Sequence, residues 1–269
     1  MNRLHLLGTW AITIALLGGC GPTPPEQQEA TGTRSAEKKE EKKAPEQKPI
    51  QKEEWTEKRH AMVKHDIQPR SPEVADERVL EAMRTVPRHK FVPPKYRALA
   101  YSDRPLPIGH DQTISQPYIV ALMTDRLQVE PEDRVLEVGT GSGYQAAVLS
   151  ELCKEVYTIE IVEELAKQAR KRLKRLGYEN VHVRDGDGFY GWEEHQPYDT
   201  IIVTASPEEM PQRLLAQLKS GGRMVIPLET TGVMQHLVAI TKTAEGETSR
   251  EVICPVRFVP MTGRIEKVD

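Results

Sequence analysis

The chain has 269 residues, of which 38% are hydrophobic and 29% are charged, and its formal net charge is −3. That length accommodates one domain with additional segments, and the weakly negative charge gives no support to a nucleic-acid partner. The three cysteines form no Cys-x-x-Cys pair and no zinc-type spacing with histidine, so we expect no metal site. We interpret Cys153 and Cys254 as two buried thiols.

The first 20 residues have the features of an export signal. Arg3 provides a positive charge, residues 4–17 are mostly apolar, and Leu17-Gly18-Gly19-Cys20 follows. An apolar segment this short fits a signal peptide better than a membrane span. The four residues resemble a bacterial lipoprotein cleavage box, which implies lipidation of Cys20 and a membrane tether on the periplasmic side. A chance apolar N-terminus on a cytoplasmic protein is the alternative.

We interpret residues 21–70 as a disordered linker. The segment is rich in Pro, Glu, Lys and Gln and contains the run Lys38-Lys39-Glu40-Glu41-Lys42-Lys43. Almost none of its side chains can bury apolar surface against the entropy cost of ordering the chain. A spacer of this kind suits a lipid-anchored domain. The folded domain is therefore expected to span residues 71–269.

Two helices separated by a connector precede the first strand of the expected domain. Ser71-Pro72 is typical of a helix start, and an apolar stripe typical of a helix follows and ends before Pro87. The proline-rich connector from Phe91 to His110 is irregular, and a long irregular stretch inside a compact domain is usually functional. Pro117 begins a second helix that continues through Leu127.

From residue 134 onward, strand and helix patterns alternate. Strands are expected at 134–138, 155–160, 180–184, 199–204, 222–228, 235–242 and 251–259, and helices at 143–153, 162–176 and 208–218. This alternation predicts an α/β, Rossmann-like fold in which a mainly parallel sheet carries helices on both faces. The last two strands have no helix between them, so they should form an antiparallel edge.

A glycine-rich turn, Gly139-Thr140-Gly141-Ser142-Gly143, follows the first of these strands. Its spacing is shorter than that of the dinucleotide fingerprint, which brings a helix N-terminus to a pyrophosphate. It therefore suits a nucleoside cofactor without phosphate, for which S-adenosylmethionine is the candidate. Glu160 ends the next strand, where a carboxylate meets ribose hydroxyls, and Asp187-Gly188 stands where an adenine-binding turn belongs. The alternative is that the glycines serve only packing and that Glu160 is a surface acid.

Distinctive strings recur between residues 87 and 260. The most specific are Thr113-Ile114-Ser115-Gln116-Pro117 and the segment from Val135 to Gln145; the others are Pro87 to Val92, Leu106 to Gly109, Gly186-Asp187-Gly188, Ile202 to Ala205, Gly221-Gly222-Arg223, Pro227 and Val256 to Pro260. In combination they resemble the protein-L-isoaspartate (D-aspartate) O-methyltransferase family over residues 71–262. The departure is residues 1–70, because members of that family typically begin near the Ser71 helix.

The resemblance implies methyl transfer from S-adenosylmethionine to the free α-carboxylate of L-isoaspartyl residues in damaged proteins, with D-aspartyl residues as further candidate acceptors. Ser115 matches the family's active-site serine, and Thr262 matches a cofactor or substrate contact. Thr113 and His110 stand beside the serine and are candidate substrate contacts, although a surface position for His110 is equally consistent. Because an α-carboxylate is already ionised at neutral pH, we assign Ser115 to orienting it. The residues alone would make Ser115 a helix cap.

Three other functions are compatible with parts of this pattern. They are a methyltransferase of the same fold with another acceptor, a binding protein that has lost catalysis, and a nicotinamide dehydrogenase. The complete set of glycine turn, Glu160, Asp187 and Ser115 argues against lost catalysis, and the glycine spacing argues against the dehydrogenase. We expect a monomer. The export signal conflicts with a cofactor made in the cytoplasm; an inefficient signal, cofactor supply outside, and a downstream start codon are three explanations.

Overall fold

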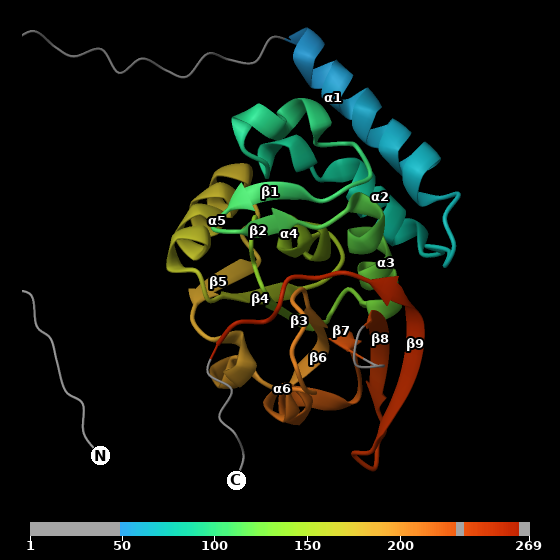
Figure 1. Cartoon of the computed structure of the whole chain (residues 1–269), viewed down its shortest axis with the longest axis vertical. Coiled ribbons are helices and arrows are strands. Elements are labelled where there is room, and N and C mark those ends of the chain that lie inside the picture. The colour runs from blue at the N-terminus through green and yellow to red at the C-terminus, as the bar shows by residue number, and fades with distance from the viewer. Residues whose placement is uncertain (1–48, 230–233, 264–269) are drawn as a thin grey trace, which may run out of the picture. The chain divides into compact units, whose positions relative to one another are not determined.

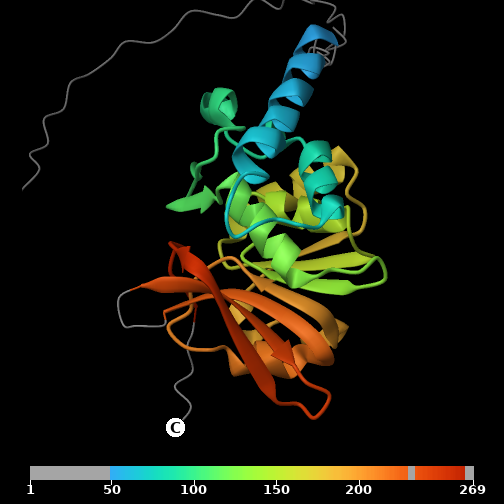
Figure 2. The ribbon, with the colours of Figure 1, turned by 90° about the vertical axis from the view of Figure 1, so that its right-hand side faces the viewer.

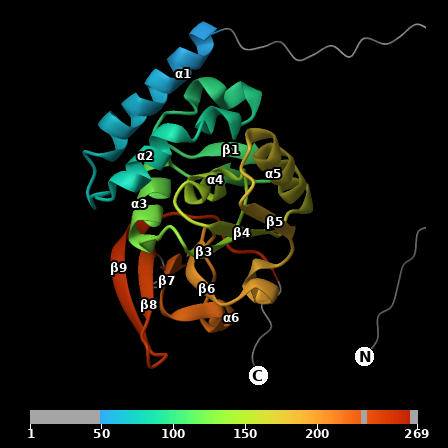
Figure 3. The same ribbon diagram turned by 180° about the vertical axis from the view of Figure 1, so that it is seen from behind.

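The computed structural model describes residues 49–229 and 234–263. A seven-stranded sheet forms its centre, in the order β5-β4-β3-β6-β7-β8-β9. The strands are β3 (Arg134–Val138), β4 (Glu155–Glu160), β5 (Val181–Asp185), β6 (Tyr198–Val203), β7 (Leu218–Glu229), β8 (Gln235–Lys242) and β9 (Thr248–Val256). The first five in sequence pair in parallel, whereas β8 runs antiparallel to both β7 and β9. The predicted parallel sheet with an antiparallel edge is confirmed, and β9 and β5 lie at opposite edges (Figure 3).

Helices cover both faces of this sheet, as the alternating pattern predicts (Figure 1). The domain has two hydrophobic cores, and adjacent residues of β3 belong to different ones. Val135 packs with α3 (Pro117–Leu127), α4 (Tyr144–Ser150) and α5 (Glu163–Leu176), whereas Leu136 packs with α6 (Gln212–Gln217). Strand side chains alternate between faces, so each buried strand must supply both cores. In Figure 2, β8 and β9 (red) lie at the opposite end of the view from the N-terminal helix (blue).

The folded domain begins earlier in the sequence than the predicted boundary at residue 71. Helix α1 (Pro49–Met62) and a π-helical turn (Val63–Ile67) lie in the second half of the predicted linker. The Lys/Glu-rich composition hides a few anchoring side chains: Val63 and Ile67 are fully buried, and Trp55 stacks on His89 with ring centroids 4.6 Å apart. Residues 21–48 and the predicted signal with Cys20 lie outside the described residues.

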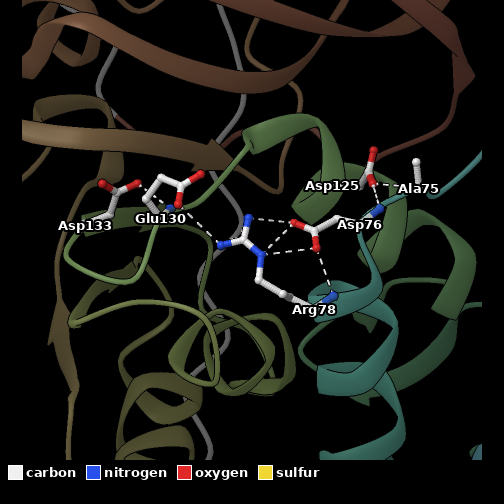
Figure 4. A network of polar contacts seen from close by, with 6 residues as sticks. All are labelled: Ala75, Asp76, Arg78, Asp125, Glu130 and Asp133. Atoms are coloured by element: carbon white, nitrogen blue, oxygen red, sulfur yellow. Dashed lines mark hydrogen bonds and ion pairs between the residues drawn. The ribbon is translucent and has the colours of Figure 1, made fainter.

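The predicted helix start at Ser71-Pro72 is also wrong, because Asp76 provides the cap of α2 (Glu77–Thr85). The Asp76 side chain accepts a hydrogen bond from the Arg78 N–H at 2.8 Å, while Ser71-Pro72 forms a bend. The preceding backbone is tied to α3, since Asp125 Oδ1 accepts the N–H groups of Ala75 and Asp76 at 2.9 and 2.8 Å (Figure 4). A carboxylate on α3 therefore fixes where α2 begins.

A two-stranded hairpin that the sequence analysis did not anticipate begins in the proline-rich connector and ends just after it. Strand β1 (Leu106–Gly109) pairs antiparallel with β2 (Gln112–Ile114), and two 3-10 helices, Arg88–Lys90 and Pro94–Leu99, precede it. In Figure 1 the hairpin lies beside α4 and α5, above the strands of the sheet. The connector thus carries the Ser115 loop toward the glycine turn.

The other boundaries agree with the predictions to within a few residues. The match is complete for α3, β3, β4 and β8, whereas α6 is shorter than predicted and begins after Pro211. Cys153 and Cys254 are free thiols, the first buried and the second half-buried. No helix within the described ranges has the length and apolar character needed to cross a membrane.

Candidate functional site

A cleft opens at the carboxyl ends of β3, β4 and β6, and we call it the inner cleft. Val138, Ile159 and Thr204 line it where these strands end. Successive strands are added on one side of β3 up to β5 and on the other side from β6 onward, so this position is the topological switch point of the sheet. Open α/β sheets bind ligands at such points.

The predicted glycine turn forms one wall of the inner cleft. Gly139 has a φ of +99°, which favours glycine, and a β-carbon at this position would lie 2.3 Å from Thr204 Oγ1. That hydroxyl donates to the Gly139 carbonyl at 2.7 Å, so the turn is tied to the residue that follows β6. Thr140, Gly141 and Ser142, which were predicted to bind the cofactor, line the cleft.

Glu160 holds the turn and the next strand together. Its carboxylate is buried and accepts the Gly141 N–H at 2.7 Å through Oε2 and the Val162 N–H at 3.0 Å through Oε1. Each carboxylate oxygen has two acceptor positions, so both retain capacity for a ligand hydroxyl. The alternative of a surface acid is therefore wrong. Ile161, which follows, exposes 41% of its surface and adds an apolar wall to the cleft.

Ser115 stands where the inner cleft meets a second hollow, which we call the outer cleft. The outer cleft is lined by Gln116 and Ile119 on one side and by Val256 and Phe258 on the other. Ser115, together with Thr113, lines both hollows. Gln116, and not Ser115, is the N-cap residue of α3, so the capping alternative is not what the structure shows.

A buried arginine holds the backbone of Ser115. Arg88 is fully buried; its Nε donates to the Ala100 carbonyl at 2.8 Å and its Nη2 donates to the Ser115 carbonyl at 2.7 Å. Its guanidinium also lies over the Tyr144 ring, 4.8 Å from the centroid. Burial lowers the pKa of Arg88 to about 10, so the group stays charged at neutral pH. Tyr144 also lines the inner cleft.

A buried carboxylate holds the other end of the Ser115 loop. Asp103 accepts the Tyr118 N–H at 2.9 Å and the Gln116 side-chain amide at 2.7 Å, and it forms an ion pair with Arg70. The first of these bonds satisfies a backbone donor in the first turn of α3. Because Arg70 precedes the expected domain start, the segment that was predicted to be a linker helps to position the loop.

Not every predicted site residue lines a cleft. His110 is exposed at the turn of the β1–β2 hairpin, with a φ of +53°. The Asp187 carboxylate caps a short 3-10 turn by accepting the Phe189 N–H at 2.9 Å, and its neighbour Gly188 lines the inner cleft instead. A β-carbon on Gly143 would lie 3.1 Å from Leu173 of α5, so this glycine permits close helix packing. Thr262 does line the inner cleft.

The segment after β9 supplies a wall that the sequence analysis largely missed. It crosses back over the strand ends (Figure 1), where the Ser206 N–H donates to the Val259 carbonyl at 2.9 Å and the Met261 N–H to the Ser206 carbonyl at 2.7 Å. Val259 to Thr262 line the inner cleft. Trp192 packs edge-on against Tyr157.

A buried acid lies beneath the glycine turn. Glu137 is fully buried and accepts the Thr158 hydroxyl at 2.5 Å, and that hydroxyl is 2.6 Å from the Thr140 hydroxyl of the turn. Burial, with a smaller contribution from the charge of Glu160, raises the pKa of Glu137 to about 8. The group is therefore mainly protonated at neutral pH.

A profile of the protein-L-isoaspartate(D-aspartate) O-methyltransferase family (PCMT) matches residues 57–266. The chain belongs to this family. The match begins within α1, in agreement with the earlier domain start. The resemblance found in the sequence is thereby confirmed for the enzyme domain.

Curated relatives and solved structures agree with the family. The chain is 60% identical over 189 residues to protein-L-isoaspartate O-methyltransferase 2 of Polaromonas sp., covering 70% of this chain and 90% of that protein. It is 54% identical to the Gloeobacter violaceus enzyme, covering 75% and 97%. A protein-L-isoaspartate O-methyltransferase structure superposes with a TM-score of 0.69 at 30% identity, covering 77% and 66%. The Plasmodium falciparum structure in complex with S-adenosyl-L-homocysteine gives 0.65 at 26%, covering 76% and 98%.

Proposed function

We propose that the two clefts bind the two substrates of a protein repair methyltransferase. The inner cleft takes S-adenosylmethionine, and the outer cleft takes the damaged polypeptide that carries an L-isoaspartyl or D-aspartyl residue. The observation that carries this proposal is the position of Ser115, which lines both hollows. Methyl donor and acceptor must meet at one point, and the two hollows join along Thr113, Ser115, Thr204, Val259 and Pro260. Ser115 is the member of this shared wall that matches the family's active-site serine.

The residues of the inner cleft fit the cofactor. Glu160 offers free acceptor positions to ribose hydroxyls, the exposed Ile161 offers an apolar surface to a base, and the glycine turn leaves room for close approach. Gly188 lines the cleft at the turn assigned to adenine, whereas the Asp187 carboxylate contributes to the shape of that turn. S-adenosylmethionine supplies an electrophilic methyl group on a positively charged sulfur.

The acceptor needs orientation more than activation. A free α-carboxylate has a pKa of about 3.5 and is ionised at neutral pH, so no general base is required. The Ser115 hydroxyl makes no hydrogen bond to any of the described residues and is available to donate one to the acceptor. Holding reactants in alignment contributes up to about 7–11 kcal/mol to a reaction of this type. We therefore assign Ser115 a positioning role, with Thr113 beside it.

A methyl-transfer assay with matched peptides tests this function. One peptide carries an L-isoaspartyl residue and the other a normal aspartyl residue at the same position. We expect the first to be methylated and the second not, since only the first presents a free α-carboxylate. Equal methylation of both peptides, or of neither, would contradict the assignment.

We also propose that the N-terminus anchors the enzyme to a membrane through Cys20, with the domain on the periplasmic side. The support is the order of a basic start, a short apolar segment, small residues and cysteine, followed by a polar spacer. Cells fed labelled palmitate should label the wild-type chain but not Cys20→Ser. Label that persists in the variant would refute the anchor. A monomeric mass in solution is expected for the chain without residues 1–20.

A further inference from the structure

A pocket behind the glycine turn carries several cations and no acid among the residues that line it. Its wall is formed by Lys90 and Arg97 from the two 3-10 helices, by Arg172 and Arg175 from α5, and by Gly141 and Ser142 of the turn. It differs from the inner cleft, because α5 and the connector form it instead of the strand ends. A concentration of like charge in one hollow attracts an oppositely charged ligand.

The like charges act on one another. Burial lowers the pKa of Arg172, and the neighbouring Arg175 lowers it further. Desolvation likewise lowers the pKa of Lys90, with contributions from Arg97 and Arg175. Arg97 and Arg175 make no ion pair within residues 49–229 and 234–263. An anion between them would relieve this repulsion.

The rest of the pocket favours a compact anion. Ile108 and Leu165 give it an apolar floor, which strengthens electrostatic attraction relative to open water. Arg172 is already oriented, since it donates to the Ser142 carbonyl at 2.7 Å. Guanidinium groups match phosphate oxygens in pairs, and three of them suit a dianion better than a single carboxylate.

We propose that this pocket binds a phosphate group, either as free phosphate or as a phosphomonoester. The site is independent of the methyl-transfer chemistry. The pocket adjoins the inner cleft, because Gly141 and Ser142 of the glycine turn line both the pocket and the inner cleft.

Titration of the full chain with inorganic phosphate tests the proposal, with chloride keeping the ionic strength constant. We expect saturable heat by calorimetry and at least tenfold weaker binding by the double variant Arg97→Gln/Arg175→Gln. The matched control is Lys171→Gln/Lys174→Gln, which removes two exposed charges from α5 outside the pocket. This control should bind phosphate like the wild type. Both variants should melt at the wild-type temperature.

Two further ligands identify the source of the phosphate. O-phosphoserine that binds at least as tightly as free phosphate, and is lost in the arginine variant, would assign the site to phosphomonoesters; weaker binding would assign it to the free ion. The absence of saturable binding, or an equal loss in both double variants, would overturn the proposal. So would a hexaglutamate peptide that displaces phosphate at equal affinity, because the pocket would then recognise acidic polypeptide.

Discussion

The glycine turn at 139–143 and the Ser115 loop both line the inner cleft, but they are fixed in different ways. The turn is held from the ends of the two neighbouring strands, by Glu160 of β4, 19 positions from Gly141, and by Thr204 after β6, 65 positions from Gly139. The Ser115 loop is held by Arg88, 27 positions away, and through Gln116 by Asp103, 13 positions away. The cofactor side is therefore fixed by side chains at the ends of the sheet strands, whereas the acceptor side is fixed by side chains of the segment that precedes the sheet. A substitution on the cofactor side should lower cofactor affinity, whereas a substitution on the acceptor side should lower turnover and leave cofactor affinity unchanged.

The largest effect is expected from Gly139→Ala, which breaks the cofactor side. The left-handed backbone costs an alanine about 1–2 kcal/mol, and its β-carbon would also collide with Thr204 Oγ1 at 2.3 Å. We expect cofactor affinity to fall by about 100-fold, or about 2.7 kcal/mol, as measured by calorimetry.

Gly221→Ala is the matched control for this substitution. Gly221 also has a positive φ, +80°, but no heavy atom lies within 4 Å of the position of its β-carbon. It should lose only the backbone contribution to stability and keep wild-type cofactor affinity. Equal cofactor affinities for the two variants would show that the contact with Thr204 does not matter.

Arg88→Met breaks the acceptor side. The substitution keeps much of the side-chain volume but leaves the Ala100 and Ser115 carbonyls without their donor, which costs about 1–3 kcal/mol for each buried group. Denaturant unfolding should show this loss. Turnover of the isoaspartyl peptide should fall at least about tenfold, equal to about 1.4 kcal/mol, while cofactor affinity changes less than about threefold. A cofactor affinity that falls as much as turnover would contradict the separation of the two sides.

The smallest effect is a pH dependence beneath the glycine turn. Burial raises the pKa of Glu137 to about 8 from 4.5, so the native state binds an extra proton between these values. Stability is then greatest below the unfolded pKa and is lost as pH rises through the folded value. His89 has the opposite sign, because burial lowers its pKa from 6.5 to about 4, so stability rises with pH between these values.

The contribution of Glu137 is therefore isolated between pH 6.5 and 8, above the range in which His89 titrates. Urea unfolding of the wild type should show falling stability across this window. Glu137→Gln keeps a neutral group beside Thr158 and should remove most of that slope. A slope of the same size in the variant would show that other groups cause it.

The same contrast explains what could be predicted from the sequence. The strands from β3 to β8 and the helix at Pro117 follow from apolar runs and turn residues, which are local signals. Helix α1 is held to the domain by a few contacts, such as the stacking of Trp55 on His89, and the composition of the segment does not reveal these contacts. A motif can predict where a residue lies without predicting what its side chain contacts. Asp187 lies at the predicted turn, but its carboxylate caps that turn by accepting the Phe189 N–H. Asp76 is a typical helix-capping residue, but Ser71-Pro72 gave a competing signal for the helix start five residues earlier.

The most direct test of the account is Ser115→Ala, measured for both cofactor affinity and turnover of the isoaspartyl peptide. One hydrogen bond to a charged acceptor contributes about 1.5–3 kcal/mol. Turnover should therefore fall about 10- to 100-fold, while calorimetry finds cofactor affinity within about threefold of the wild type. Equal losses of affinity and turnover, or no loss of either, would contradict the position of Ser115 between donor and acceptor.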